Sequence, residues 1–416
     1  MVKTLETRRL VEAEPEDVGM SSARLDNVPR LVQSYIDDGK YPGAISMVAR
    51  RGKVVHFETY GQMDVEAGKP VTPETIYRIF SMTKPIASVG LMTLYEEGRF
   101  QLDDPASKFI PQFKGLKVLE GGTADSYTTR EASREITIRD LLTHCSGLTA
   151  GGTATPVAQL YQRAGLRGSQ SDGTLVDFID KLGSLPLKCD PGAEWNYGVS
   201  TDVVGHLCEV MSGQRLDTFL RERILDLLGM VDTGFQVPAS EIHRFAANYK
   251  FGGDNGAKYS LSDAPASSPY TQPRTYLSGA GGMVSTASDY MRFCKMLANG
   301  GELDGARIIG PRTLKYMTLN HLPGGHDLSA LNSSGPTESA RDGVGFGLGF
   351  AVLLNPAVSQ TLGTPGEYYW GGAASTAFFV SPAEELTMVF LTQLQPSSSY
   401  PIRRELRIAI HQAIID

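Results

Sequence analysis

A serine and a lysine three residues apart, Ser81 and Lys84, are the pair of side chains best suited to nucleophilic chemistry. A hydroxyl is a weak nucleophile that needs a base within hydrogen-bond reach, and a spacing of three places both groups on one face of a helix. Pro85 follows, and its missing N–H is tolerated only in the first helical turn, so we expect the helix to begin near Ser81. The positive end of the helix dipole and burial in a cleft then disfavour the ammonium form of the lysine. The pattern therefore predicts a serine nucleophile with a lysine base.

A second interpretation of the same two residues involves no catalysis. In that case Ser81 caps a helix and Lys84 faces solvent. No other serine in the chain has a lysine three residues further on, which slightly favours the catalytic interpretation. The two residues alone leave both interpretations open.

A tyrosine in a predicted loop, Tyr197, lies just before a predicted helix. A phenol is a poor base near neutral pH and needs a nearby cation, such as Lys84, to stabilise its charged form. With that cation Tyr197 is a candidate proton relay, although a loop tyrosine alone more often serves packing. We expect Ser200 or Thr201 to cap the following helix and Asp202 to favour its dipole.

Two glycines, Gly371 and Gly372, follow Trp370 just ahead of a predicted strand pair near the end of the chain. Glycines at a strand entrance let a ligand approach the backbone closely, and an edge strand can offer an N–H to a developing oxyanion. One such donor contributes about 3 to 4 kcal/mol in other hydrolases. The alternative is a glycine-rich turn with Trp370 in a core.

Apolar periodicity predicts the elements that must position these groups. Helical spacing extends over 21–38, and two β-type runs at 44–49 and 53–59 predict a hairpin. Strand-like runs return at 377–381 and 386–392. Helices are expected at 82–97, 138–142, 175–182, 201–212, 216–228 and 402–415. Because sheet elements lie toward both ends, we expect an α/β lobe built from both ends, an inserted helical lobe, and a cleft where the two meet.

Length and composition restrict the class of protein. The chain of 416 residues exceeds what one core usually supports, which favours two packed lobes or one enlarged two-layer domain. Two long connections, 149–171 and 251–273, are rich in Gly, Ser, Thr and Pro, and we expect them to line a site. The net charge is −7 and Lys and Arg are scattered, so a nucleic-acid partner is not expected.

The chain shows no targeting, membrane or metal-binding pattern. Residues 1–20 lack the apolar stretch of a signal peptide, and no run elsewhere approaches transmembrane length, so we expect a cytoplasmic protein with no membrane partner. The cysteines lie far apart without the spacing of metal ligands, which predicts neither a metal site nor a disulfide framework. They are Cys145, Cys189, Cys208 and Cys294.

Taken in order, these motifs resemble the serine β-lactamase and penicillin-binding-protein superfamily, and most closely its esterase branch, the family VIII carboxylesterases related to class C β-lactamases. The resemblance covers nearly the whole chain and implies an α+β fold, with an antiparallel sheet flanked by helices plus an inserted mainly helical domain. The α/β domain would comprise 1–80 and 285–416 and the helical domain 81–284, with the active site at their interface. Further stretches that resemble the family are 102–105, Leu141-Leu142-Thr143-His144-Cys145-Ser146-Gly147-Leu148 and Gly279-Ala280-Gly281-Gly282-Met283-Val284-Ser285-Thr286.

The resemblance also implies roles for single residues. Ser81 would attack the substrate carbonyl, with Lys84 and Tyr197 sharing the base role. The backbone N–H groups of Ser81 and Ala373 would form the oxyanion hole, and no cofactor is implied. The expected substrate-binding residues are Trp370, Gly371, Gly372 and Val199.

Two departures from the superfamily pattern bear on the substrate. Val199 stands where an asparagine usually follows the tyrosine by two residues, as in the esterase branch, so an amide that would orient a β-lactam is missing. Trp370 stands where lactamases and peptidases have a lysine. At about 4 Å and an effective dielectric near 20, that ammonium would attract a substrate carboxylate with roughly 4 kcal/mol before desolvation costs. Uncharged esters are therefore the favoured substrates.

We expect a serine esterase that hydrolyses small-molecule carboxylic esters of short to medium acyl chains, with a side activity that passes the acyl group to an alcohol or amine. The alternatives are a β-lactamase or DD-peptidase and, from another class, a non-catalytic binding or sensor protein that keeps the cleft. The five-residue Gly-x-Ser-x-Gly motif is absent from the sequence, which disfavours an α/β-hydrolase. His144 is expected to have a structural hydrogen-bonding role, and the oligomeric state is left open.

Overall fold

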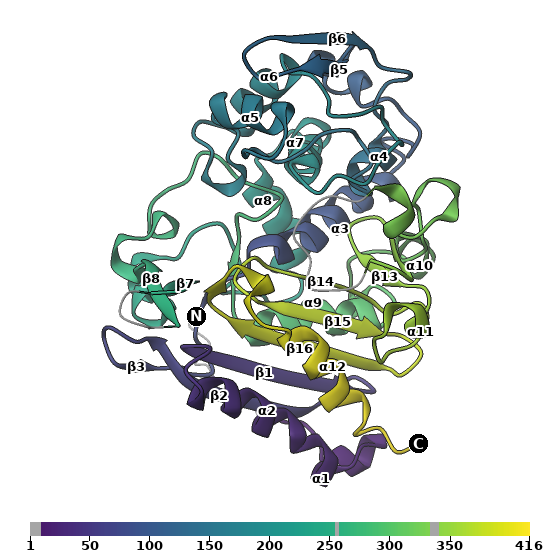
Figure 1. Ribbon diagram of the computed structural model, residues 1–416. Helices are drawn as coiled ribbons and strands as arrows, with labels where there is room; N and C mark the ends of the chain where they lie inside the picture. Colours follow the sequence, from purple (N-terminus) through teal and green to yellow (C-terminus); the bar gives the residue numbers. More distant parts are fainter. Residues whose placement is uncertain (1–9, 254–257, 333–340) are drawn as a thin grey trace.

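An eight-stranded sheet joins the two ends of the chain in the computed structural model, which describes residues 10–253, 258–332 and 341–416 (Figure 1). The strand order is β12-β13-β14-β15-β16-β1-β2-β3. Strand β1 (Gly43–Arg50) pairs antiparallel with both β16 (Leu386–Thr392) and β2 (Lys53–Asp64). The remaining strands of this sheet are β3 (Lys69–Pro70), β12 (Val344–Phe346), β13 (Ala351–Leu353), β14 (Tyr368–Gly371) and β15 (Ala377–Ser381). Strands from both ends of the chain therefore lie in one sheet.

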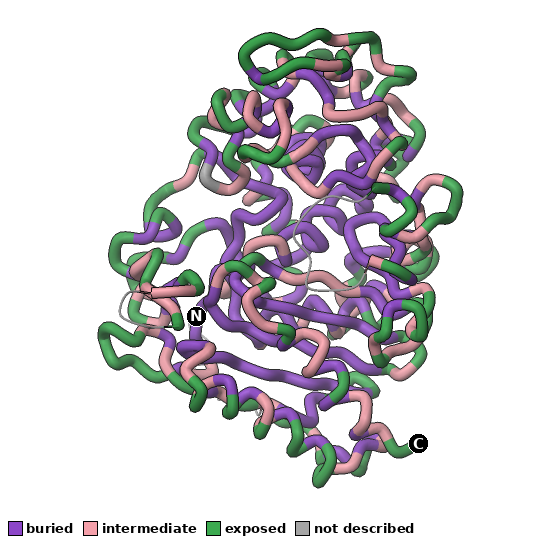
Figure 2. The backbone as a smooth tube through the Cα atoms, viewed as in Figure 1, coloured by how far each residue is buried: buried purple, intermediate pink, exposed green. Residues whose placement is uncertain are grey.

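Helices cover both faces of the sheet, so its central strands are buried on each side (Figure 2). In β1, Ile45 and Met47 belong to one hydrophobic core and Ala44 and Val48 to the other, because successive side chains alternate between faces. Helices α2 (Asn27–Asp37) and α12 (Ile402–His411) pack on the second core, and α9 (Ala287–Ala298) packs on the first. This double coverage explains why β1 and β16 are mostly apolar on both faces.

The predicted helix over 21–38 is interrupted. Helix α1 (Ser22–Leu25) is capped by Ser21, whose hydroxyl accepts a hydrogen bond from the Arg24 N–H, and α2 begins only at Asn27. Pro29 lacks the N–H that a continuous helix would donate to the Leu25 carbonyl, so the two segments are separate.

The second lobe is mainly helical and packs α3 (Thr83–Glu96) against α7 (Ser200–Ser212) and α8 (Leu216–Leu220). The predicted helix over 216–228 was wrong in its second half, where α8 passes into a π-helical segment, Arg221–Leu225. The predicted cap of α7 was also wrong, because the N-cap is Val199 and makes no side-chain cap bond. Further helices of this lobe are α4 (Ile138–Leu142), α5 (Pro156–Arg163) and α6 (Leu175–Gly183), of which α5 lies inside a predicted loop.

Short strand pairs complete the fold. A hairpin at the tip of the helical lobe, β5 (Lys117–Gly122) with β6 (Tyr127–Glu131), was not predicted because its residues are mostly polar and exposed. β7 (Asn248–Phe251) pairs with β8 (Tyr259–Asp263) and with β17 (Leu394–Gln395). β4 (Tyr77–Arg78) pairs with β9 (Val284–Ser285) just before the predicted nucleophile.

All strands of the main sheet fall within 1–80 and 285–416, and α3 to α8 fall within 81–284. The division into two domains stays a prediction, and the α+β class is confirmed. Residues 1–9, part of the segment predicted to lack a signal peptide, lie outside the described residues, as do 254–257 of the predicted loop 251–273. In the part of the chain that the structure describes, no helix has the length and apolar character needed to cross a bilayer.

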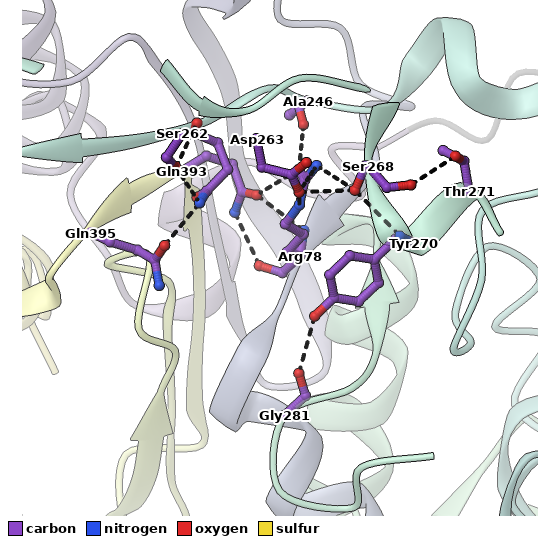
Figure 3. Close-up of polar contacts among 11 residues, drawn as sticks. Arg78, Ala246, Ser262, Asp263, Ser268, Tyr270, Thr271, Gly281, Gln393 and Gln395 are labelled. Carbon is purple, nitrogen blue, oxygen red and sulfur yellow. Dashed lines mark hydrogen bonds and ion pairs between the residues drawn. The ribbon is translucent and has the colours of Figure 1, made fainter. Parts of the chain in front are cut away.

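Arg78, three residues before Ser81, has a buried guanidinium that connects three parts of the fold. Arg78 is 1% exposed and donates to the Asp263 carboxylate at 2.7 Å and to the Ala246 carbonyl at 2.6 Å (Figure 3). The Gln393 side chain makes two hydrogen bonds with the Arg78 backbone. Its Oε1 accepts from the Arg78 N–H, and its Nε2 donates to the Arg78 carbonyl. The Arg78 guanidinium also lies 4.0 Å from the Phe245 ring centroid. The network fixes the strand that leads to Ser81.

We expect Arg78→Met to lower the free energy of unfolding by about 3 kcal/mol or more, because the Asp263 carboxylate and the Ala246 carbonyl lose the hydrogen bonds from the guanidinium. Urea denaturation measures the change. Arg30→Met is the control, since the exposed Arg30–Asp26 pair at 3.8 Å contributes less than about 1 kcal/mol. Equal effects of the two substitutions would contradict this account of Arg78.

Candidate active site

The predicted nucleophile and base lie together at the start of α3. Lys84 Nζ is 3.1 Å from Ser81 Oγ, and it also donates to the Ala280 carbonyl at 2.7 Å. Lys84 is 4% exposed, whereas Ser81 is half-buried and lines a cleft. The alternative in which Lys84 faces solvent is therefore excluded. Pro85 lies in the first turn of α3, as its missing N–H requires.

The backbone is strained immediately before Ser81. Phe80 has φ of 44°, in the left-handed region that side chains other than glycine rarely adopt. A short 3-10 helix, η2 (Phe80–Met82), carries Ser81 between this residue and α3. The Ile79 N–H donates to the Met283 carbonyl at 3.1 Å, and the Tyr290 hydroxyl donates to the Met82 carbonyl at 2.9 Å. These contacts hold the strained turn from both sides, and such strain concentrates at functional sites.

Tyr197 lies beside the lysine. Lys84 Nζ is 4.5 Å from the centroid of the Tyr197 ring, within the range of a cation–π contact. The same ring packs against Trp195 at 5.8 Å, Trp370 at 5.5 Å and His144 at 5.0 Å between centroids. Tyr197 is therefore both packed, as the alternative supposed, and adjacent to the cation that a proton relay requires.

His144 supports the tyrosine loop through its backbone. Its carbonyl accepts the Asn196 N–H at 2.8 Å, next to Tyr197. The imidazole is buried, and its Nδ1 has no hydrogen-bond partner among the described residues. Burial, and secondarily the positive charge of Lys84, hold the pKa of His144 well below its usual value. His144 therefore contributes to the structure in two ways: its carbonyl accepts a main-chain hydrogen bond, and its neutral ring packs against aromatic side chains.

Gly371, the last residue of β14, and Gly372 just after it are needed for the packing of the protein itself. A Cβ on Gly372 would lie 2.4 Å from the Ile79 carbonyl oxygen, and one on Gly371 would lie 2.5 Å from Arg403 Cζ. The Arg403 guanidinium donates to the Gly372 carbonyl at 2.7 Å and to the Thr376 carbonyl at 2.9 Å. Gly372 therefore lets the end of β14 lie directly against the segment that leads to Ser81, and Gly371 leaves room for Arg403. The atoms that approach these glycines belong to the protein, whereas the sequence analysis expected a ligand to approach the backbone here.

A cleft of about 950 Å³, open to solvent, contains most of the expected site residues. Ala373 is exposed in the turn between β14 and β15 and lines the cleft together with Ser81, so both expected oxyanion donors border one space. Val199 is 2% exposed and packs in the main core, apart from the residues that line the cleft. The lining includes Ser81, Trp195, Tyr197, Trp370, Gly371, Gly372 and Ala373.

Three contributors to the site were not assigned roles from sequence. Ala280 provides the carbonyl that holds Lys84, although it lies in a stretch that carried the family resemblance. Arg403 lies four residues before Arg407 on α12, a spacing that places both on one helix face. Trp195, next to the tyrosine motif, stacks on Tyr197 at an interplanar angle of 20°.

Comparison with known proteins identifies the family. The Beta-lactamase family model matches residues 28–413. Protein Rv1367c of Mycobacterium tuberculosis is 32% identical over 379 residues, covering 90% of this chain and 91% of the relative. Esterase EstB of Burkholderia gladioli is 30% identical over 416 residues, covering 95% of this chain and 96% of the relative.

Solved structures agree with the sequence relatives. EstCE1, described as a hydrolase with promiscuous acyltransferase activity, has a TM-score of 0.78 and 26% identity, covering 94% of this chain and 99% of that chain. The resemblance drawn from the motifs is thereby confirmed, together with the antiparallel sheet and inserted helices that it implied. Because the family model spans almost the whole chain, the protein belongs to the Beta-lactamase family.

Proposed function

We propose that the protein is a serine esterase that hydrolyses carboxylic esters of short to medium acyl chains through an acyl-enzyme on Ser81. The observation that carries this proposal is the 3.1 Å contact of the buried Lys84 Nζ with Ser81 Oγ at the edge of a solvent-open cleft. The names of two relatives support it, since EstB is an esterase and EstCE1 a hydrolase.

The proposed reaction begins when Lys84 Nζ accepts the Ser81 hydroxyl proton and Oγ attacks the ester carbonyl carbon. The carbonyl oxygen becomes an oxyanion that the N–H groups of Ser81 and Ala373 stabilise. Expulsion of the alkoxide, which takes up the proton, leaves the acyl group on Oγ. Water then attacks the acyl carbonyl and releases the acid, which regenerates Ser81. Tyr197, beside Lys84, shares the proton transfer.

An alcohol or amine can replace water in the second half of this scheme, so acyl transfer is a side activity of the same site. Every step up to the acyl-enzyme is common to hydrolysis and transfer. The described acyltransferase activity of EstCE1 supports this extension.

The aromatic part of the cleft wall favours uncharged groups, and Arg341, Arg403 and Arg407 also line the cleft. Trp370 lines the cleft and packs edge-on against Phe346, with ring centroids 5.3 Å apart. Together with Trp195 and Tyr197 it presents aromatic surface to the acyl or alcohol group of an ester. A carboxylate placed there would lose hydration without gaining a cation from Trp370.

We predict that Ser81→Ala lowers kcat/KM for p-nitrophenyl butyrate by several orders of magnitude, up to about a millionfold by analogy with other serine nucleophiles. Release of nitrophenol measures the change. Ser88→Ala is the matched control, because Ser88 is a buried serine on α3, the helix that follows Ser81, and it should keep activity within about threefold. Activity retained by Ser81→Ala removes Ser81 from the mechanism.

Lys84→Ala and Tyr197→Phe should each cause large losses of kcat that do not add in the double variant, since both groups act on one proton path. A double-mutant cycle on kcat/KM for the same ester tests this coupling. Full additivity would mean that the two residues act independently.

Trp370→Lys should raise kcat/KM for nitrocefin, which carries a carboxylate, about tenfold or more relative to kcat/KM for the neutral ester. The attraction of roughly 4 kcal/mol at 4 Å is reduced by desolvation, so only part of it is expected. Trp370→Met is the control, because it removes the indole without adding charge. Equal ratios in the two variants would contradict the charge argument.

A further inference from the structure

A carboxyl group with no exposed surface lies behind the candidate catalytic lysine. Asp202, in the first turn of α7, is 0% exposed. Its Oδ1 accepts the Ser278 hydroxyl at 2.6 Å and the Ala280 N–H at 3.3 Å. Burial raises its pKa, against the lowering effects of the Ser278 hydrogen bond and the Lys84 charge. Burying a carboxyl group costs free energy, so the hydrogen bonds of Asp202 must offset that cost.

The residue that Asp202 holds is also the residue that holds Lys84. The Ala280 N–H donates to Asp202, and the Ala280 carbonyl accepts from Lys84 Nζ at 2.7 Å. One residue therefore joins the buried carboxyl group to the amine. The N–H and the carbonyl belong to adjacent peptide units, so a rotation of the backbone at Ala280 would move the acceptor of Lys84.

The loop around Ala280 is fixed on its other side as well. The Gly281 N–H donates to Ser278 Oγ at 3.1 Å, and the Gly281 carbonyl accepts the Tyr270 hydroxyl at 3.3 Å (Figure 3). A Cβ on Gly279 would lie 2.6 Å from the Thr201 carbonyl oxygen, so this loop lies directly on the first turn of α7. Asp202 thus holds the loop where it contacts α7.

We propose that Asp202 is a positioning residue for the lysine base. By fixing Ser278 and Ala280 it sets the carbonyl that directs Lys84 Nζ toward Ser81 Oγ. The proposal rests on the esterase function proposed above, because it assigns Asp202 to the same proton transfer. A lysine side chain has a flexible four-carbon stem, and a small displacement of a catalytic group can lower a rate by about 100-fold.

Asp289 offers a matched comparison within the chain. It lies in the first turn of α9 and is 3% exposed. Its Oδ2 accepts one backbone N–H, from Asp232 at 2.8 Å, and one hydroxyl, from Thr233 at 3.0 Å. Asp289 thus accepts the same kinds of donor as Asp202, but its partners belong to a loop that holds no candidate catalytic group.

The test measures kcat and KM separately for p-nitrophenyl butyrate, together with the thermal midpoint, in Asp202→Ala, Asp202→Asn and Asp289→Ala. We expect Asp202→Ala to lower kcat roughly 10- to 100-fold with KM within about threefold of the unmodified protein. Asp202→Asn should restore most of kcat, because an amide oxygen can accept the same two hydrogen bonds. Asp289→Ala should lower the thermal midpoint comparably and leave kcat within about twofold.

Equal kcat values in Asp202→Ala and Asp289→Ala, or a loss confined to KM, would overturn the positioning role. If Asp202→Ala does not fold, Ser278→Ala decides the question, because it removes one of the two donors and keeps the carboxyl group. A kcat for Ser278→Ala equal to that of the unmodified protein overturns the proposal, and a kcat at least about threefold lower supports it. An unmodified protein that releases no nitrophenol would reject the esterase function and this inference with it.

Discussion

A lysine amine removed from water must find hydrogen-bond acceptors inside the protein, and this constraint organises the candidate active site. Lys84 is 4% exposed, and its Nζ has the Ser81 hydroxyl on one side and the Ala280 carbonyl on the other. Two acceptors from segments almost two hundred residues apart hold the amine against a potential nucleophile. An unpaired amine at this depth would be strongly destabilising, so the site and the local packing are stabilised by the same contacts.

The fold brings these segments together through its sheet and through close backbone approaches. Pairing of β1 with β16 closes the chain on itself, and β14 lies two strands from β16 in the same sheet. Gly372 lets the end of β14 lie against Ile79, two residues before Ser81. Arg403, on the last helix, fixes the carbonyl of Gly372. The position of Ala373 beside the cleft therefore depends on contacts from the end of the chain.

Local patterns predicted much of this arrangement. The strands at 377–381 and 386–392 and the helix at 138–142 have the bounds that apolar periodicity indicated, and the spacing of Ser81 and Lys84 indicated that the two side chains share one face. Helix α5 was missed because Gly, Ser and Thr on both sides of it resemble a loop. The Ala280 contact, the Arg403 contact and the burial of Val199 depend on tertiary packing, which no local pattern encodes. The relation to the Beta-lactamase family was recognisable because several motifs occur in order along the chain.

The central claim is that the acyl group passes through Ser81, and trapping the acyl-enzyme tests it most directly. The protein would be mixed with a slowly deacylating ester, quenched in acid and digested with trypsin. Pro85 blocks cleavage after Lys84, so Ser81 and Ser88 share the peptide 79–99, and fragment ions must distinguish them. The account predicts the acyl mass on Ser81. Acylation confined to another residue, or hydrolysis of the ester with no acyl group on this peptide, would contradict it.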